Sequence, residues 1–489
     1  MASITSNSNL FKLDSSWGKL GEAKAMFGEW KPQSCDYDFQ NVMEAFRYLE
    51  SGRARGKSLG DPAYAPVKGT VFHQLLYFNR LYDYQAETAR SVRTFRLLAP
   101  EMSEHYTTDT RNVEHVLKTR FEEYSKGKYN KELVRDLLGY GIFAVDGDKW
   151  RQQRKLASYE FSTRVLRDFS SASFRTNAAK LVRLVMRFSH KAQVFDMQDI
   201  LMRCTLDSIF KVGFGVELNC LEGSSKEGTE FMKAFDESNA LVYWRYVDPL
   251  WKIKKFLNIG CEATLKNNVK LMNDFVLSVI KAKRQHMANQ DYNDKEDIIS
   301  RFLMESKKDP KTMNDEYLRD IILNFMIAGK DTSASTLSWF FYMLCKHPLI
   351  QEKVAQEDGR TAETDDILPD GYKLKKGDGV YYMAYAMGRM SYIWGDDAEE
   401  YRPERWLKNG KFQPESPFKF ISFHAGPRIC LGKDFAYRQM KIVSMALLRF
   451  FRFKLENETR NVTYKTMFTL HIDKGLPICA IPRSSNSYT

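Results

Sequence analysis

The chain has 489 residues, 43% of them apolar and 28% charged, a length and balance that suit a globular protein with a large core. The net charge of +12 favours an anionic partner, but no nucleic-acid-binding motif accompanies it and most of the charge is dispersed. We expect no transmembrane helix, because no run of 18 apolar residues occurs, and no secretory signal. Seven scattered cysteines lack the paired spacing of a zinc site.

Secondary-structure signals begin after residues 1–63, which are polar and show no recognisable pattern. Either a disordered extension or an incorrect start of the gene model explains that segment. Short strands are expected at 94–98 and 103–106, then a helix near 110–124 and a long helical series over 149–213. Further helices are expected at 261–287 and 314–346, and short strands near 372–374, 380–383, 467–472 and 475–482. Periodicity alone therefore predicts one large, α-rich domain.

The segment from Phe423 to Gly432 is the most informative of the chain. Cys430 stands in its glycine-rich turn, directly before an apolar-periodic helix, so backbone N–H groups and the helix dipole are expected to favour a thiolate. A thiolate is a soft metal ligand, and as the axial ligand of haem it favours O–O cleavage. Arg428 is placed to pair with a haem propionate. A lone cysteine would rather indicate a buried residue in a capping turn, but here Phe423, Gly426, Arg428, Cys430 and Gly432 occur together.

This segment closely resembles the cysteine loop of the cytochromes P450, and the resemblance runs from about Tyr64 to the C-terminus. It implies a cytochrome P450 fold, mainly α with small peripheral β-sheets, over 64–489. It also implies that heme b is the cofactor and that Cys430 is the axial ligand of its iron. Phe423, Gly426 and Arg428 would belong to the haem-binding loop.

The helix expected at 314–346 contains the run Ala328-Gly329-Lys330-Asp331-Thr332. An Ala-Gly pair thins a helix and lets a flat ligand lie against its backbone, and a hydroxyl beside a carboxylate can deliver protons. On most helices, however, such Asp and Thr side chains are simply solvated or bonded back to the backbone. The run resembles the oxygen-activation motif of the P450s, which implies that Thr332 and Asp331 are a proton-relay pair.

Trp150 and Arg154 stand at i and i+4, so they share one helix face and could donate to one anion. From these residues alone, an exposed cationic helix is an equally good interpretation. In the P450s a Trp-xxx-Arg helix contacts a haem propionate, and the resemblance assigns both residues to that role. Arg360 is a weaker propionate candidate, and a surface position is the alternative.

The chain departs from the family near residues 357–358. Residues 403–406 resemble the P450 meander, whose arginine, here Arg405, normally joins a Glu-xx-Arg pair on an earlier helix. That helix is not found: the Glu-xx-Arg spacing at 132–135 comes too early in the chain, and the one at 357–360 contains Gly359. We therefore expect a deletion near 357–358, from a skipped exon or a faulty gene model, that leaves Arg405 without its partner. The N-terminal membrane anchor of microsomal members is also missing from residues 1–63.

Long stretches at 141–162 and 432–441 resemble the plant clan of fatty acid ω-hydroxylases. The resemblance implies a monooxygenase at the cytosolic face of the endoplasmic reticulum that acts on long-chain fatty acids with O2 and electrons from NADPH-cytochrome P450 reductase. Residues 241–257 mix aromatic and basic side chains and would rest on a membrane surface, unless they form a packed helix with a basic edge. The alternatives for the whole chain are a remnant that does not retain haem, and an isomerase that uses no O2, which the Asp331–Thr332 pair disfavours.

Overall fold

The computed structural model describes residues 61–483, apart from residues 72, 100–101, 163, 249, 290–296, 312 and 347–357. The expectations for residues 1–60 and for Glu357 lie outside this part of the chain. Within it, long helices dominate and the sheets are small, so the predicted mainly α fold with peripheral β-sheets is confirmed.

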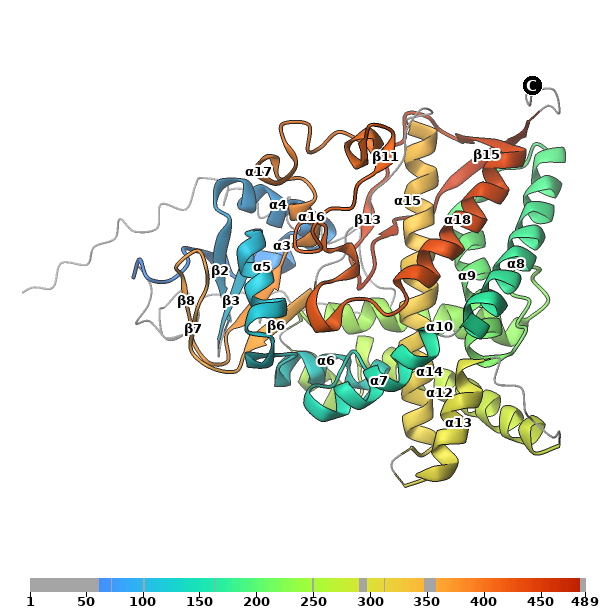
Figure 1. Cartoon of the computed structure of the whole chain (residues 1–489), viewed down its shortest axis with the longest axis horizontal. Coiled ribbons are helices and arrows are strands. Elements are labelled where there is room, and N and C mark those ends of the chain that lie inside the picture. Colours follow the sequence, from blue (N-terminus) through green and yellow to red (C-terminus); the bar gives the residue numbers. More distant parts are fainter. Residues whose placement is uncertain are drawn as a thin grey trace, which may run out of the picture.

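The largest sheet lies at one end of the molecule (Figure 1) and has the strand order β1-β2-β3-β9-β6-β4. Its strands are β1 (Val67–Thr70), β2 (Thr94–Leu98), β3 (Ser103–Thr107), β9 (Gly379–Tyr382), β6 (Asp358–Ala362) and β4 (Tyr124–Ser125). β2 and β3 form an antiparallel hairpin, and β3 pairs in parallel with β9, which joins the two halves of the chain. The short helices of this end are α3 (His73–Leu76), η2 (Phe78–Arg80), α4 (Leu81–Ser91), α5 (Thr110–Glu114), α16 (Ala384–Met387) and α17 (Ser391–Trp394).

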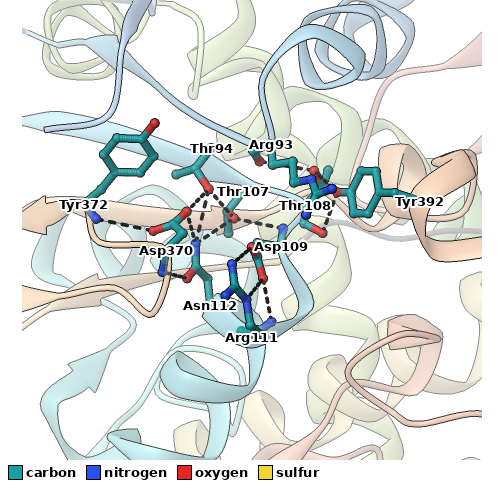
Figure 2. Close-up of polar contacts among 10 residues, drawn as sticks. All are labelled: Arg93, Thr94, Thr107, Thr108, Asp109, Arg111, Asn112, Asp370, Tyr372 and Tyr392. Carbon is teal, nitrogen blue, oxygen red and sulfur yellow. Dashed lines mark hydrogen bonds and ion pairs between the residues drawn. The ribbon is translucent and has the colours of Figure 1, made fainter. Parts of the chain in front are cut away.

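A buried polar cluster fastens the loops of this end to the sheet (Figure 2). The carboxylate of Asp370 accepts hydrogen bonds from Thr94 Oγ1 at 2.5 Å and from Asn112 Nδ2 at 2.6 Å. The hydroxyl of Thr107 lies 2.9 Å from that of Thr94. Strands β2 and β3, helix α5 and the turn that contains Asp370 all contribute to these bonds. The cluster therefore fixes the position of α5 and of that turn.

The helices form the other end and enclose the main core. They are α6 (Lys128–Leu138), α7 (Gly147–Ser162), α8 (Arg164–His190), α9 (Met197–Phe214), α10 (Lys226–Trp244), α11 (Trp251–Leu257), α12 (Gly260–Asn289), α13 (Ile298–Lys308), α14 (Asp315–Met326), α15 (Thr332–Lys346) and α18 (Lys433–Phe450). α9 is buried on nearly all sides. A π-helical turn, η5 (Ile327–Asp331), joins α14 to α15, and together they form a rod through the middle of the molecule with α18 packed beside α15 (Figure 1).

The remaining elements are short. The strands are β5 (Phe195–Asp196), β7 (Asp366–Ile367), β8 (Lys373–Leu374), β10 (Leu407–Lys408), β11 (Lys411–Phe412), β12 (Phe451–Leu455), β13 (Tyr464–Lys465), β14 (His471–Ile472) and β15 (Pro477–Pro482). The remaining turns are the π-helical η3 (His115–Thr119) and the 3-10 turns η4 (Phe121–Glu123), η6 (Pro403–Trp406), η7 (Ile421–Phe423) and η8 (Gly426–Arg428).

Three predicted helices are interrupted in the structure. The helix expected near 110–124 ends at Glu114 and continues as η3 and η4. The series over 149–213 consists of α7, α8 and α9; β5 precedes α9, and Asp196 caps α9 by accepting the Gln198 N–H at 2.9 Å. The helix expected at 314–346 contains the wider turn η5. Apolar periodicity continues across these breaks, and for that reason it did not reveal them.

Candidate functional site

The cysteine loop runs from η7 to the first residue of α18, and backbone hydrogen bonds close it. The N–H of Cys430 donates to the carbonyl oxygen of Phe423 at 2.8 Å, and the Ile429 N–H donates to Gly426 at 3.0 Å. The Phe423 ring packs on Tyr437 of α18, with ring centroids 4.9 Å apart. Cys430 therefore lies just before the N-cap residue of α18, Gly432, as the sequence predicted.

Gly426 packs this loop against η3. Its φ of +65° favours glycine, and an added Cβ would lie 1.9 Å from the carbonyl oxygen of Leu117. Only glycine fits at this contact, so the structure gives Gly426 a role in the shape of the loop. Direct contact with haem remains a prediction.

The free Cys430 side chain does not favour the thiolate. Burial raises the pKa of its thiol above the ordinary value, although the Gly432 N–H and the charges of Arg154 and Lys433 act in the opposite direction. The expected effect of the helix N-terminus is confirmed for the Gly432 N–H, which lowers the pKa, but burial outweighs it. A metal ion deprotonates a coordinating thiol outright, so the thiolate would form together with the iron bond.

The predicted propionate residues Trp150, Arg154 and Arg428 come together beside this loop. The guanidinium of Arg428 lies 4.5 Å from the Trp150 ring centroid, and that of Arg154 lies 5.8 Å from the same ring. Arg154 Nη2 donates to the carbonyl oxygen of Ile429, next to Cys430, at 2.7 Å. Trp150 is buried, and Arg154 faces the cysteine loop. The alternative of an exposed cationic helix is therefore wrong for both residues.

Asp146 is part of this cluster, although sequence reasoning missed it. It forms an ion pair with Arg428 and accepts a hydrogen bond from Lys131 Nζ at 2.7 Å. Arg428 and Lys131 pair with this single carboxylate, and Arg154 lies against the same Trp150 ring as Arg428, so the cluster keeps a surplus of positive charge. A guanidinium has five N–H donors, and the set therefore suits a further anion such as a propionate. The signal available in the sequence was the Asp-Gly-Asp run at the start of α7, which is typical of a helix N-terminus.

Arg360 is buried, with 2% of its surface exposed, so the surface alternative is wrong. It stands on β6 directly opposite Val380 of β9, and residues in that relation share a sheet face. Tyr382 stands two residues after Val380 on the same face of β9. Its hydroxyl lies 3.0 Å from Nδ1 of His424 in the cysteine loop. Arg360 therefore lies on the sheet face that meets this loop, and its contact with a propionate remains a prediction.

On the central rod, Ala328 and Thr332 form an open face. Ala328 is exposed although Ile327 and Lys330 on either side of it are buried, and Thr332 is half-buried. Thr332 Oγ1 donates to the carbonyl oxygen of Ala328 at 2.6 Å, so the hydroxyl is bonded back to the backbone in this state. An open face in the middle of a buried helix fits a flat ligand, and π-helical turns such as η5 occur frequently at functional sites.

Gly329 has a different role from the one expected. A Cβ at this position would lie 2.7 Å from Cδ1 of Ile209, so the missing side chain lets α9 approach the rod. The expectation that the Ala-Gly pair presents one thinned surface to a ligand is therefore wrong for Gly329, and for the exposed Ala328 it remains a prediction. Asp331 is fully buried, which excludes the alternative of a solvated carboxylate.

Arg405 has partners within its own segment. Its guanidinium donates to Asp397 Oδ1 at 3.2 Å, to the Asp397 carbonyl oxygen at 2.7 Å and to the Trp394 carbonyl oxygen at 3.4 Å. Asp397, eight residues earlier in the chain, therefore supplies a carboxylate in place of the expected Glu-xx-Arg partner.

Comparison with known proteins identifies the family. The sequence model described as "Cytochrome P450" matches residues 62–361 and 358–478. Cytochrome P450 704C1 of Pinus taeda is 45% identical over 496 residues, covering 89% of this chain and 94% of the relative. Cytochrome P450 704B1 of Arabidopsis thaliana is 39% identical over 519 residues, covering 91% and 98%, and Cytochrome P450 86B1 of the same plant is 36% identical over 448 residues, covering 80% of each. The chain therefore belongs to the cytochrome P450 family of haem-thiolate monooxygenases.

Proposed function

We propose that this P450 hydroxylates long-chain fatty acids at the terminal carbon, with O2 and with electrons that a reductase takes from NADPH. The proposal of oxygen activation rests on the open face of Ala328 and Thr332. The buried carboxylate of Asp331 stands directly before Thr332 in the sequence. The substrate class rests on the resemblance of residues 141–162 and 432–441 to the plant ω-hydroxylases.

The residues of the site divide the work. Haem iron, when bound, supplies the activation of O2 for insertion into a C–H bond. Cys430 would ligate the iron, and Arg428, Arg154, Trp150 and Arg360 would hold the propionates. Thr332 would release its bond to Ala328 and donate a proton from its hydroxyl at the open face of the rod, and Asp331 would be the carboxylate that replaces this proton.

The test uses protein in which the segment proposed to be missing near 357–358 has been restored, loaded with haem and mixed with reductase, NADPH and a series of saturated fatty acids. Mass spectrometry should detect a terminal alcohol whose new oxygen comes from labelled O2 and whose yield requires NADPH. The Cys430→Ser variant is the matched control. Haem-loaded protein that forms no hydroxylated acid would contradict the substrate class, and product without NADPH would favour an isomerase.

We also propose that the chain contacts a membrane through α11, at the cytosolic face of the endoplasmic reticulum. Among the described residues, none of the helices has the length and apolar character needed to cross a bilayer. Ile253, Phe256, Leu257 and Ile259 are exposed, Phe256 to 89%, and so offer an apolar surface to lipid. The packed-helix alternative holds for the neighbouring aromatics, because Trp244 and Trp251 are buried.

Binding to vesicles tests this contact. The basic residues of the segment add little to it, because Lys252, Lys254 and Lys255 are paired with Glu132, Asp248 and Asp136. Ile253→Ser combined with Phe256→Ser should therefore weaken sedimentation with neutral and anionic vesicles alike. Undiminished sedimentation would exclude α11 as the contact.

A second candidate is an inactive P450-like remnant that does not retain haem. We propose it because a segment would be missing near 357–358. The family model matches in two pieces that meet at residues 358–361. The alignment with the pine relative runs over 496 residues, longer than this whole chain of 489, although only 89% of the chain takes part. The surplus positions are gaps in this chain. The genomic sequence between the codons for Glu357 and Asp358 tests the proposal. Codons that stand directly next to each other, with no sequence between them, would contradict it.

A cavity of about 350 Å³ also supports a missing segment. It lies between α4, α15, α16 and the residues that lead into the cysteine loop, and its lining includes Trp339, Trp394, Phe420 and Leu470. The carbonyl oxygen of Trp394 accepts from Arg405, so the cavity lies beside the arginine whose family partner is missing. The cavity is partly open to solvent at the exposed Asn79 and Arg80, and a hollow with aromatic walls beside Arg405 is expected where an element is lacking.

A further inference from the structure

Four buried or half-buried groups surround the carboxylate of Asp331. Lys330 Nζ lies 2.8 Å from Asp331 Oδ1, and Asn239 Nδ2 donates to Asp331 Oδ2 at 2.7 Å. Lys330 also forms an ion pair with Asp236. His471 of β14 is buried close enough to Asp331 and Lys330 for their charges to act on it. Asp236 and Asn239 reach this pair from outside the rod, and both stand on α10.

Each oxygen of the Asp331 carboxylate thus has its own donor. The carboxylate cannot rotate without breaking one of these two bonds, and both are charge-assisted bonds of the strong kind. Asn239, Lys330 and Asp331 are all fully buried, so water cannot replace a lost donor cheaply. Asp236 and Asn239 stand at i and i+3 of α10, and one helix face therefore supplies both contacts.

Lys330 is held in turn by Asp236, which keeps 31% of its side-chain surface exposed. Burial lowers the pKa of Lys330, but Asp236 and Asp331 outweigh this effect and raise it, so the ammonium stays charged. Burial lowers the pKa of His471 to about 4, and its ring is neutral near pH 7. The ammonium of Lys330 and the amide of Asn239 are consequently the groups that orient the carboxylate.

We propose that Asn239 is a positioning residue for Asp331, and that Asp236 supports it by holding Lys330 in place. The inference rests on the proposed role of Asp331 in moving protons and extends it to a helix outside the oxygen-activation motif. Ion pairs that merely fasten α10 to the rod would show the same bonds, so the test must report on the carboxylate itself.

The test compares Asn239→Leu with Asn268→Leu. Asn268 Nδ2 donates to Glu237 Oε2 at 2.9 Å, so the control removes the same kind of amide–carboxylate bond between α10 and α12 without touching Asp331. The infrared carboxylate band of Asp331, assigned by its loss in Asp331→Asn, is measured on purified protein with and without haem. It should shift in Asn239→Leu and stay in place in Asn268→Leu. In the haem-loaded enzyme, hydrogen peroxide formed per NADPH should rise several-fold in Asn239→Leu alone.

Asp236→Asn, with Glu237→Gln as its control, provides a second route if Asn239→Leu folds poorly. It should also shift the Asp331 band, because Lys330 loses one of its two carboxylates. An Asp331 band that is the same in both test variants and both controls would overturn the inference. Failure of the proposed relay looks different: Asp331→Asn would then leave peroxide formation unchanged, while the band would still decide whether Asn239 positions the carboxylate.

Discussion

At the scale of the residue, Cys430 shows that burial and helix position act against each other. Burial raises the pKa of its thiol, and the iron bond rather than the helix dipole would provide the thiolate. Cys430→Ser should abolish the thiolate signature of the ferrous carbon monoxide spectrum, because an alcohol is a far poorer iron ligand near neutral pH. Cys345→Ser is the control, since that cysteine is half-buried on α15 away from the loop. An unchanged spectrum in Cys430→Ser would refute the ligand assignment.

Thr332 is the residue whose loss should separate electron use from product formation. Its hydroxyl bonds to Ala328 and faces the open side of the rod, so Thr332→Ala removes the proton donor and leaves the surface apolar. NADPH consumption should continue while most of the electrons end in hydrogen peroxide. Thr336→Ala, which removes the equivalent bond one turn later, is the control. Full hydroxylation yield in Thr332→Ala would count against the relay.

Asp146 gives a pH dependence with a defined sign. Burial pushes the pKa of Asp146 upward, but Lys131, Arg428 and the Lys126 N–H outweigh it and lower the pKa below its ordinary value. A lowered pKa adds stability above the unfolded value of about 3.9, and that stability disappears as the pH falls through the folded value. Asp146→Asn should reduce the free energy of unfolding by about 1–3 kcal/mol at pH 7. Urea titrations should show the difference shrinking only below about pH 4, and a constant difference would contradict the ion pairing.

At the scale of the element, the sequence predicted best those helices and strands whose structure is decided by the apolar pattern on a single face. The strand Thr94–Leu98 and the long helix α12 appear where their patterns placed them. The π-helical turns η3 and η5 were not predicted, because a widened turn depends on what packs against it. Gly329 illustrates the reason: its contact is Ile209 of α9, which is distant in the sequence. The positioning role of Asn239 was hidden for the same reason, whereas Cys430, Trp150 and Arg428 stand in motifs with fixed spacing.

The helix α18 carries the prediction for the reductase. Lys433 and Lys441 are exposed just after the cysteine loop, whereas Arg438 donates to the Arg167 carbonyl oxygen at 3.0 Å and therefore serves the packing of α8. Reversing Lys433 and Lys441 to Glu should slow electron transfer at low salt and flatten its salt dependence, because an acidic partner would lose its attraction. The control reverses the exposed Lys270 and Lys281 of α12. Equal rates in both double variants would place the docking face elsewhere.

At the scale of the whole molecule, the two parts of the P450 sequence meet at residues 358–361, and the structure has a cavity of about 350 Å³ beside Arg405. The family motifs in the sequence predict the gap, but the substitute partners of Arg405 were not predictable, because Asp397 and the Trp394 carbonyl oxygen reach it only in the folded loop. The expected damage is therefore lost packing rather than an unpaired charge.

This distinction leads to the prediction for the chain as written. The loss of a helix removes its packing against the core, and the total stability of a protein is only about 5–15 kcal/mol. We expect the 489-residue chain to yield little or no haem-loaded protein. Inserting the Glu-xx-Arg helix of a family member after Glu357 should restore loading, measured by the ferrous carbon monoxide spectrum of both proteins purified in parallel.

Asp397→Asn separates the two causes of damage. In the chain as written, Asp397 is the carboxylate partner of Arg405, at 3.2 Å, and its loss should lower the melting temperature of the haem-free protein. With the helix inserted, the new glutamate takes over that partnership, so the same substitution should have little effect. A normal thiolate spectrum from the chain as written would show that the segment is dispensable. Arg405, held by Asp397 and backbone carbonyl oxygens, would then be sufficient to keep the meander in place behind the haem.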